Sequence, residues 1–402
     1  MRNPKNLVKA FVKRVSYYLV QKVIVSRREM VSDPRNDTVV LREGHRFVPA
    51  YTPSETNDER FPTMPEFVAV SPFFRCCVRD VCLIGPYGIP VTRRGRILQE
   101  PMQGSVLKCV RRTVAQLGVF KVVSLYLRAL LPGKADLDCG LHMVPRHGYQ
   151  AGRPNFSHWL LENMPQLFAL EDLDEPGIRI VTNDSPTAWQ CESLALMGFG
   201  RDDVFDHSKS MTRVGRLYIA TIRSATSTQS ERDPVGREWV VERLGGRRDR
   251  AEGSRRPLRV FLSRQDMRRG YITNMPDVEE VLNRYGIEVY CASDTSFQQD
   301  VDYFRHVELL VAPHGAGMAN MVFARSCHVI EIACGAKWST DLFYHTALEF
   351  GFSFDTVRAK RDHSYEESAD DVEEAWSVDI RSLELAIQRC TMLDHVHPSL
   401  SS

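Results

Sequence analysis

The stretch LLVAPHGAGMANMVF, residues 309–323, joins an apolar run to a His-Gly-Ala-Gly turn and then to the start of a helical pattern. A helix N-terminus exposes unpaired backbone N–H groups and the positive end of the helix dipole, so it attracts phosphate. Gly315 and Gly317 let the backbone approach an anion closely, and His314 can add a donor from its ring. The pattern predicts a phosphate site, although a tight turn with a merely hydrogen-bonded His314 has the same sequence signature.

Strands and helices alternate on both sides of this stretch. A short helix is expected after Gly317, and strands that alternate with helices of this length predict a parallel sheet covered on both faces. The apolar runs are typical of strands at 258–264, 287–292, 308–313 and 328–333. The amphipathic runs are typical of helices at 276–286, 296–307 and 340–351.

The upstream part repeats the alternation less regularly, with strands expected at 178–184 and 216–221 and a helix between them at 186–200. A charged, Gly-containing stretch predicts a solvated linker. We therefore expect two α/β domains with a ligand cleft between them. The predicted parts are an acceptor-side domain at 38–245, the linker at 246–257, a nucleotide-binding domain at 258–350 and a C-terminal helical segment at 351–402.

Composition limits the classes of partner. The 402 residues, 43% of them hydrophobic, are enough for two cores, and a net charge of +1 gives no sign of a nucleic-acid-binding surface. The ten cysteines show no C-x-x-C spacing, which favours free buried thiols over a disulfide framework. No set of zinc ligands has a usual spacing. We expect no nucleic acid, no metal and no cofactor.

The first 30 residues are basic and amphipathic. No acidic residue precedes Glu29, and apolar residues recur at every fourth position: Leu7, Phe11, Val15, Leu19 and Val23. This pattern predicts an N-terminal amphipathic helix over residues 1–30, whose residues 1–28 contact the anionic cytoplasmic face of a membrane. The alternative is a helix that packs its apolar stripe on the protein itself. Neither a transmembrane helix nor a signal peptide is expected, because basic residues interrupt the apolar run.

Basic residues follow the first strand of the second half, in FLSRQDMRRGYITN at 261–274. Arg264 stands where a parallel sheet opens its carboxyl edge, which is where ligands of such folds bind. A planar guanidinium can grip two phosphate oxygens at once. Arg268 and Arg269 lie one turn further on, and a solvated basic loop remains an equally good interpretation of that pair.

A candidate acid–base pair lies in the first half, in NFSHWLLENMPQL at 155–167. His158 and Glu162 are four residues apart, so they share one face of a helix. A histidine with a carboxylate beside it can act as a general base on an acceptor hydroxyl. The alternative is a histidine that only packs or caps a core helix.

Together these stretches resemble glycosyltransferase family 61, whose eukaryotic members include protein O-linked GlcNAc transferases and plant xylan xylosyltransferases. The order and spacing of the blocks carry the resemblance, and this sequence departs from the family's pattern at Met275, at Gln299 and Asp300, and at Gln166. The matching blocks are VCLIGPYGIPVTRRGRILQE, NFSHWLLENMPQL, FLSRQDMRRGYITN, SFQQDVDYFRHVELLVAPHGAGMANMVF and VIEIA, between residues 80 and 350.

The resemblance implies an α/β, GT-B-like architecture, with two Rossmann-like domains facing a cleft and the nucleotide-sugar donor held by the second. It implies UDP as the nucleotide and His158, Trp159 and Glu162 as family positions in the first domain. The family's donor-side motifs fall on Ser263, Arg264, His314, Gly315, Ala316, Gly317, Asn320 and Glu331, with Arg269 in the same arginine block.

The chemistry of such a transfer agrees with these residues. Negative charge develops on the departing β-phosphate, and positioned N–H groups with Arg264 would stabilise it most in the transition state. Glu331, at the end of a strand, suits ribose hydroxyls. We therefore predict an inverting, metal-independent hexosyl- or pentosyltransferase that acts on a glycan or lipid-linked acceptor, with His158 as base and Glu162 as its orienter or the base itself.

Two other classes of protein remain open at this point. One is a non-catalytic relative that binds a sugar nucleotide or a glycan. The other is a sugar-nucleotide epimerase, which lacks support because no G-x-G-x-x-G follows an early strand.

Overall fold

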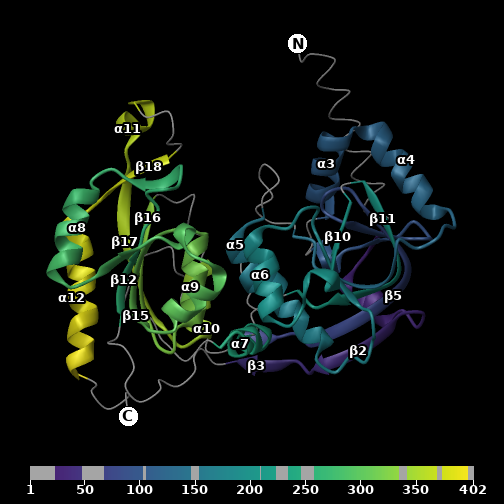
Figure 1. Ribbon diagram of the computed structural model, residues 1–402, viewed down its shortest axis with the longest axis horizontal. Helices are drawn as coiled ribbons and strands as arrows, with labels where there is room; N and C mark the ends of the chain where they lie inside the picture. The colour runs from purple at the N-terminus through teal and green to yellow at the C-terminus, as the bar shows by residue number, and fades with distance from the viewer. Residues whose placement is uncertain are drawn as a thin grey trace. The chain divides into compact units, whose positions relative to one another are not determined.

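The computed structural model describes residues 23–47, 68–102, 106–145, 154–208, 210–222, 234–245, 258–334, 342–368 and 374–396. The chain divides into two compact units. The first comprises Met1–Gly44 and Ser71–Ser224, and the second comprises His45–Val70 and Ala225–Ser402. Figure 1 labels the helices and strands of each unit.

Among the described residues, the first unit contains a nine-stranded mixed sheet. Its strands are β1 (Ile24–Val25), β2 (Asp37–Arg42), β5 (Phe73–Ile84), β6 (Ile89–Thr92), β7 (Ile97–Leu98), β8 (Leu137–His142), β9 (Arg179–Thr182), β10 (Val204–Asp206) and β11 (Met211–Ala220). The order is β1-β7-β6-β5-β11-β8-β9-β10, with β2 also on β5. The long antiparallel pair of β5 and β11 forms its centre, and β8, β9 and β10 continue from β11 as parallel strands.

Helical segments of the first unit cover this sheet. They are α2 (Arg27–Ser32), η1 (Glu100–Met102), α3 (Val106–Leu117), α4 (Val119–Leu130), α5 (Phe156–His158), η2 (Trp159–Asn163), η3 (Met164–Leu170), α6 (Ala188–Leu196) and η4 (Arg201–Asp203). In the segment from α5 to η3, Trp159 is fully buried, and its indole N–H donates to Ser193 Oγ of α6 at 2.9 Å. That bond satisfies the one polar atom of a large buried side chain and fixes the segment to α6.

The second unit contains a seven-stranded sheet within the described residues. Its strands are β12 (Leu258–Leu262), β13 (Arg269–Ile272), β14 (Glu288–Tyr290), β15 (Val307–Pro313), β16 (His328–Cys334), β17 (Ser353–Arg361) and β18 (Glu374–Val378). The order is β13-β18-β17-β16-β15-β12-β14. Five neighbouring strands, β17, β16, β15, β12 and β14, are parallel to one another. The separate hairpin pairs β3 (His45–Phe47) with β4 (Val68–Val70).

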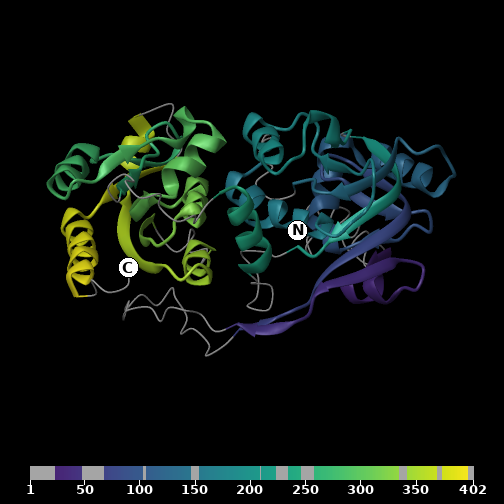
Figure 2. The ribbon, with the colours of Figure 1, turned by 60° about the horizontal axis from the view of Figure 1, so that its bottom comes forward.

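Helices lie on both faces of the second sheet. The helical segments of this unit are α7 (Pro234–Arg243), α8 (Met275–Arg284), η6 (Ala292–Asp294), α9 (Phe297–Phe304), η7 (Ala316–Phe323), α10 (Leu342–Glu349), α11 (His363–Ser368) and α12 (Ile380–Val396). Figure 1 shows α8 and α12 on one face and α9 and α10 on the other, and Figure 2 shows yellow α12 outside the same strands from another side. Because both faces are covered, β15 and β16 are buried along almost their whole length.

Several predictions from the sequence are confirmed. The chain is α/β, the second half has a parallel sheet with helices on both faces, and all ten cysteines are free. The GT-B arrangement and its cleft stay predictions. Residues 1–22, which carry most of the predicted amphipathic helix, and the predicted linker at 246–257 lie outside the described residues.

Two expectations of helix were wrong. The helix predicted over residues 1–30 does not run through its last part, because Ile24 and Val25 pair with β7 and Ser26 caps the new helix α2. The segment after residue 352 is not wholly helical, since it supplies β17 and β18 before α12. Residues Val357 to Lys360 alternate between buried and exposed, which is the period of a strand.

Candidate active site

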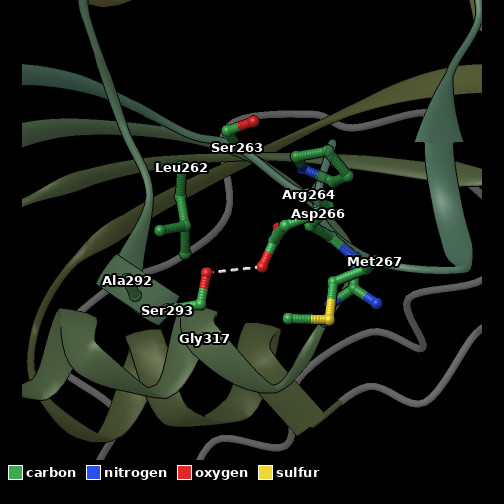
Figure 3. A pocket seen from close by; sticks show the side chains of 10 residues that line it. Leu262, Ser263, Arg264, Asp266, Met267, Ala292, Ser293 and Gly317 are labelled. Atoms are coloured by element: carbon green, nitrogen blue, oxygen red, sulfur yellow. Dashed lines mark hydrogen bonds between the residues drawn. The ribbon is translucent and has the colours of Figure 1, made fainter. Parts of the chain in front are cut away.

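A pocket with an empty volume of about 340 Å³ opens where the parallel strands β12 and β15 end. That is the edge at which α/β sheets bind ligands. Three segments supply its wall: the end of β12 with the loop after it, η6, and the His-Gly-Ala-Gly turn. Its lining residues are Leu262, Ser263, Arg264, Asp266, Met267, Ala292, Ser293, Pro313, Gly315 and Gly317, most of which Figure 3 labels.

Arg264 lies directly against the turn. A side-chain carbon added at Gly315 would stand 1.8 Å from Nη1 of Arg264, and one added at Gly270 would stand 3.0 Å from Nε. On its other side the guanidinium donates from Nε and Nη2 to the carbonyl oxygen of Arg269, at 3.2 and 2.9 Å. Two glycines and one carbonyl therefore form a slot for this guanidinium, and the structure brings Arg264 and the predicted turn together.

The environment of Arg264 combines burial with two nearby acids. Burial lowers the pKa of the guanidinium, and the charges of Asp266 and Glu374 oppose that shift. Arginine keeps its charge under such conditions because its pKa starts far above neutrality. The slot therefore presents a fixed positive charge at the wall of the pocket.

The glycines of the turn leave room for neighbouring side chains. Gly315 has φ 177°, which is extended backbone that any residue adopts, so its missing side chain is what leaves room for Arg264. A carbon added at Gly317 would stand 3.1 Å from Cδ2 of Leu262. The sequence predicted glycines for close approach of an anion, whereas in the structure the guanidinium itself occupies the space beside Gly315. Ala316 follows as the first residue of η7 and is partly buried.

His314 is held by Glu331. Its Nδ1 lies 2.5 Å from Oε1 of Glu331, and its backbone N–H donates to the carbonyl of Ile332 at 2.8 Å. A carboxylate at Nδ1 favours the tautomer with a proton on that nitrogen and fixes the orientation of the ring. Glu331 is only 4% exposed, and its observed contact is with His314, whereas the sequence analysis assigned it to ribose hydroxyls.

Asn320 does not belong to the pocket lining. It is fully buried, and its Nδ2 donates to Oδ2 of Asp300 at 3.3 Å. Oδ1 of Asp300 accepts from the hydroxyls of Tyr290 and Thr295, each at 2.7 Å. This network joins η7 to α9 and to the end of β14. In the structure Asn320 thus anchors the helix behind the turn, while its predicted contact with the diphosphate stays untested.

His158 and Glu162 come together in the first unit, as their spacing predicted. Nδ1 of His158 lies 2.9 Å from Oε2 of Glu162, and the side chain of Glu162 is 2% exposed. The side chain of Asn155 caps α5 by accepting from the backbone N–H of His158 at 3.3 Å. The next turn, η2, is a π-helix. Such turns are rare and occur often at functional sites.

The pocket also contains residues that the sequence analysis did not select. Oγ of Ser293 donates to Oδ2 of Asp266 at 2.5 Å, the bond drawn in Figure 3. Asp266 is two residues beyond Arg264, and Ser293 follows the end of β14, which neighbours β12. That adjacency of carboxyl ends was the available signal. The side chain of Arg269 is exposed and is not part of the lining, and its contribution is the carbonyl that holds Arg264.

Residues 156–330 match the family model described as Glycosyltransferase 61. This part of the chain is a glycosyltransferase family 61 domain. The match runs from the first residue of α5 into β16 and contains every predicted site residue except Glu331, which lies one residue beyond it. No curated protein matches the chain.

The match confirms the resemblance found in the sequence, and the family implies glycosyltransferase activity in the broad sense. It contains both the His158–Glu162 pair and the pocket with Arg264, so the two sets of polar residues belong to one family domain. Within the described residues, no three His, Cys, Asp or Glu side chains are grouped so that they could hold a metal ion.

Proposed function

We propose that the protein transfers a sugar from a UDP-sugar to a hydroxyl of a glycan or lipid-linked acceptor, with inversion and without a metal ion. One observation carries the proposal: the guanidinium of Arg264 is fixed against the His-Gly-Ala-Gly turn at the carboxyl ends of two parallel strands. A diphosphate is the group that such a wall attracts, because cation, turn and helix N-terminus all favour an anion there.

The leaving group gains charge as the sugar departs. Arg264 and the first N–H groups of η7 would stabilise the β-phosphate oxygens, and losing one such donor costs about 3–4 kcal/mol. His314 belongs to the same turn and would contact the diphosphate through its ring, which Glu331 orients from 2.5 Å at Nδ1. Ser263 lines the same wall and would contact the diphosphate through its hydroxyl.

The nucleoside end of the donor needs partners for its hydroxyls. Asp266 is exposed at the pocket, and Ser293 donates to its Oδ2. A carboxylate can accept several hydrogen bonds, so Asp266 can also accept from ribose hydroxyls. Carboxylates at the ends of such strands bind ribose hydroxyls in other α/β proteins. We assign this role to Asp266, because Glu331 is buried against His314.

The acceptor side would rest on His158 and Glu162. His158 accepts the proton of the acceptor hydroxyl, whose oxygen then attacks the anomeric carbon while the bond from that carbon to the diphosphate oxygen breaks. Glu162 orients the ring from 2.9 Å and balances the charge that the ring gains. A single displacement of this kind inverts the configuration of the anomeric carbon.

In this scheme, the Arg264 guanidinium and the N-terminus of η7 take the role that a divalent metal ion has in metal-dependent sugar transfer. Treatment with EDTA should therefore leave the rate of transfer roughly unchanged, because Arg264 and backbone N–H groups supply the charge that a divalent ion otherwise supplies. The measurement is UDP release with EDTA and with added Mg²⁺ or Mn²⁺. A rate that needs the added ion contradicts the metal-free part of the proposal and leaves the reaction class intact.

The basic segment at 1–28 would bring the enzyme to the cytoplasmic face of a membrane, where a lipid-linked acceptor is found. Its lack of any acidic residue and its apolar repeat support this proposal. Fractionation of cells that express the chain without residues 1–28 tests it. Membrane association that is unchanged by the deletion excludes the segment as the anchor.

The donor is tested by calorimetric titration of UDP, other nucleoside diphosphates and their sugars, followed by product assays on those that bind. We expect UDP to bind, Arg264→Ala to weaken it by roughly two orders of magnitude, and His158→Ala to abolish turnover while binding persists. UDP binding without turnover on any acceptor favours the alternative of a non-catalytic sugar-nucleotide-binding relative. Failure of every nucleotide to bind excludes both.

A further inference from the structure

The helix α4 carries an exposed apolar stripe. Phe120 is 89% exposed, and the other four members are each more than half exposed. The stripe consists of Val119, Phe120, Val123, Leu127 and Leu131. Steps of three and four residues put these side chains along one face of the helix. Exposed apolar residues that gather in this way mark an interaction site, whereas scattered ones do not.

The opposite face of α4 is packed into the first unit. Leu125 and Ala129 are buried in a cluster with residues of β5, β6 and α3, and Tyr126 donates from its hydroxyl to the carbonyl of Gly95 at 2.8 Å. The helix is thus fixed from behind and stands at the margin of its unit (Figure 1). The stripe is therefore the outward surface of a rigid element.

The surroundings of the stripe are positively charged. Between Glu100 and Asp136 the chain has no acidic residue and six basic ones: Lys108, Arg111, Arg112, Lys121, Arg128 and Lys134. Lys121 and Arg128 each follow a stripe residue by one position, so they lie on the adjacent face of α4. The bond from Tyr126 to Gly95 also holds the β6–β7 turn against this helix. That turn adds Arg94, and Arg93, which pairs with Asp80 at 3.9 Å.

The charge selects among possible occupants. Residues 1–22 are amphipathic but carry Arg2, Lys5, Lys9, Lys13, Arg14 and Lys22 without an acid, so they would be repelled. A second copy of the same face would likewise bring like charges together. An anionic lipid surface satisfies both features, since acyl chains accept the apolar stripe and headgroups neutralise the cations.

The length of the helices favours a position on the surface of a bilayer. No single described helix is long and apolar enough to cross a membrane, and only α3 and α4 taken together have the length and composition, with a bend of 117° between them. The buried side of α4 is committed to the core of the unit. The stripe is the face of α4 that remains exposed to lipid.

We propose that the α4 stripe inserts into the headgroup region of an anionic membrane and docks the first unit there. This contact is separate from residues 1–28 and does not depend on which donor or acceptor the enzyme uses. The apolar side chains of the stripe face the acyl chains, with Lys121 and Arg128 at the level of the phosphates.

A position-specific probe tests the contact in the full chain. Benzoylphenylalanine is incorporated in place of Phe120 or, as a control, in place of the exposed Leu385 of α12. The protein is irradiated with phosphatidylcholine vesicles that contain roughly 30% phosphatidylserine. We expect lipid adducts from position 120 alone. Adducts to a second copy or to residues 1–22 overturn the proposal, as does the absence of lipid adducts at position 120.

A binding measurement supplies the second arm. In sedimentation with the same vesicles, Phe120→Ser with Leu127→Ser should weaken partitioning by roughly tenfold or more. The matched control, Leu196→Ser with Leu385→Ser, replaces two exposed leucines of α6 and α12 and should have no effect. Equal partitioning of both double variants would falsify the docking role of α4. Exposed substitutions of this kind leave stability almost unchanged.

Discussion

At the scale of single residues, the glycine of the turn and the arginine of the neighbouring strand form one device. Gly315 has extended backbone, and the volume that a side chain would fill is occupied by Arg264. Both residues were predicted from the sequence, but the glycine was attributed to the close approach of a phosphate. The contact between them needed coordinates, because the residues are 51 positions apart.

Gly315→Ala should therefore behave like loss of Arg264. The added carbon would stand 1.8 Å from Nη1, so the guanidinium must leave its slot. We expect UDP binding to weaken by roughly a hundredfold, and the double variant with Arg264→Ala to be no worse than Arg264→Ala alone. Calorimetric titration of UDP gives both numbers.

Gly317→Ala is the matched control in the same turn. Its added carbon meets the side chain of Leu262, whose nearest atom is Cδ2 at 3.1 Å, the far end of a flexible side chain. We expect a much smaller effect on UDP affinity. If both alanine variants bind UDP equally well, the slot does not position Arg264 for the donor.

Asp266→Asn should weaken UDP but not pyrophosphate. A hydrogen bond from a ribose hydroxyl to a charged group contributes about 1.5–3 kcal/mol, and the amide removes the charge. UDP affinity should fall by roughly tenfold or more, whereas pyrophosphate should bind no less tightly. Competition titrations with the two ligands separate these outcomes. Asp302→Asn, on the exposed side of α9, is the control.

At the scale of elements, two buried histidines hold the turn between β5 and β6. Nε2 of His142 lies 2.9 Å from the carbonyl oxygen of Gly88, and Nε2 of His207 lies 2.7 Å from that of Gly85. Burial lowers the pKa of each imidazole from 6.5 to about 4. Both rings are therefore neutral near pH 7, each with a proton on the nitrogen that donates to the turn.

Acid should destabilise the first unit through these rings. Between about pH 6.5 and 4 the unfolded chain binds protons that the folded chain does not, so stability is complete above that window and is lost as pH falls through it. Each ring can change the free energy of unfolding by about 3 kcal/mol at most across this window, because a shift of one pKa unit corresponds to about 1.4 kcal/mol. Urea unfolding from pH 8 to pH 4.5 measures the slope.

Substitution identifies the source of this slope. His142→Gln or His207→Gln should make the pH dependence shallower, even where either lowers stability at pH 8. His363→Gln, on α11 of the second unit, is the control, because it changes a histidine outside the first unit. A slope that persists in both buried variants shows that other groups carry it.

The elements themselves were predictable to different extents. The helices at α8 and α9 and the strands β12, β15 and β16 follow from apolar periodicity and caps, because those signals are local. β17 and β18 were missed, since charged residues such as Arg358 and Lys360 on an alternating segment also fit a solvated helix. Their pairing with β16 and β13 is what makes them strands.

At the scale of the whole molecule, α7 is the first described element after β11, the last strand of the first unit. A buried ion pair joins Arg237 of α7 to Glu349 of α10. Both side chains are almost fully buried, at 2% and 3% exposed. Such pairs contribute little net stability, but losing one partner leaves a buried charge uncompensated.

Arg237→Met should destabilise the second unit by about 3–5 kcal/mol. The double variant with Glu349→Met should recover much of that loss, because it removes the unpaired carboxylate as well. Midpoints of urea unfolding, followed by a probe in the second unit, give both values. A neutral single variant would show that Glu349 has another counter-charge.

The candidate site shows where local information ends. His158 and Glu162 could be paired from the sequence because helical spacing alone brings them to 2.9 Å. Asn320 and Glu331 were also predicted as site residues. Their partners, Asp300 and His314, lie on other elements, so the contacts that these two side chains make could not be predicted from local sequence. Asp266 and Ser293 were overlooked because only the adjacency of β12 and β14 joins them.

The α/β class, the order of strands and helices around the turn, and the family could be predicted from the sequence, because periodicity and motif spacing are properties of the chain. The contact of Arg264 with Gly315, the pairing of Glu331 with His314 and the outward face of α4 became evident only from the fold. Those outcomes depend on which segments pack together, and close packing allows only one side chain in each place.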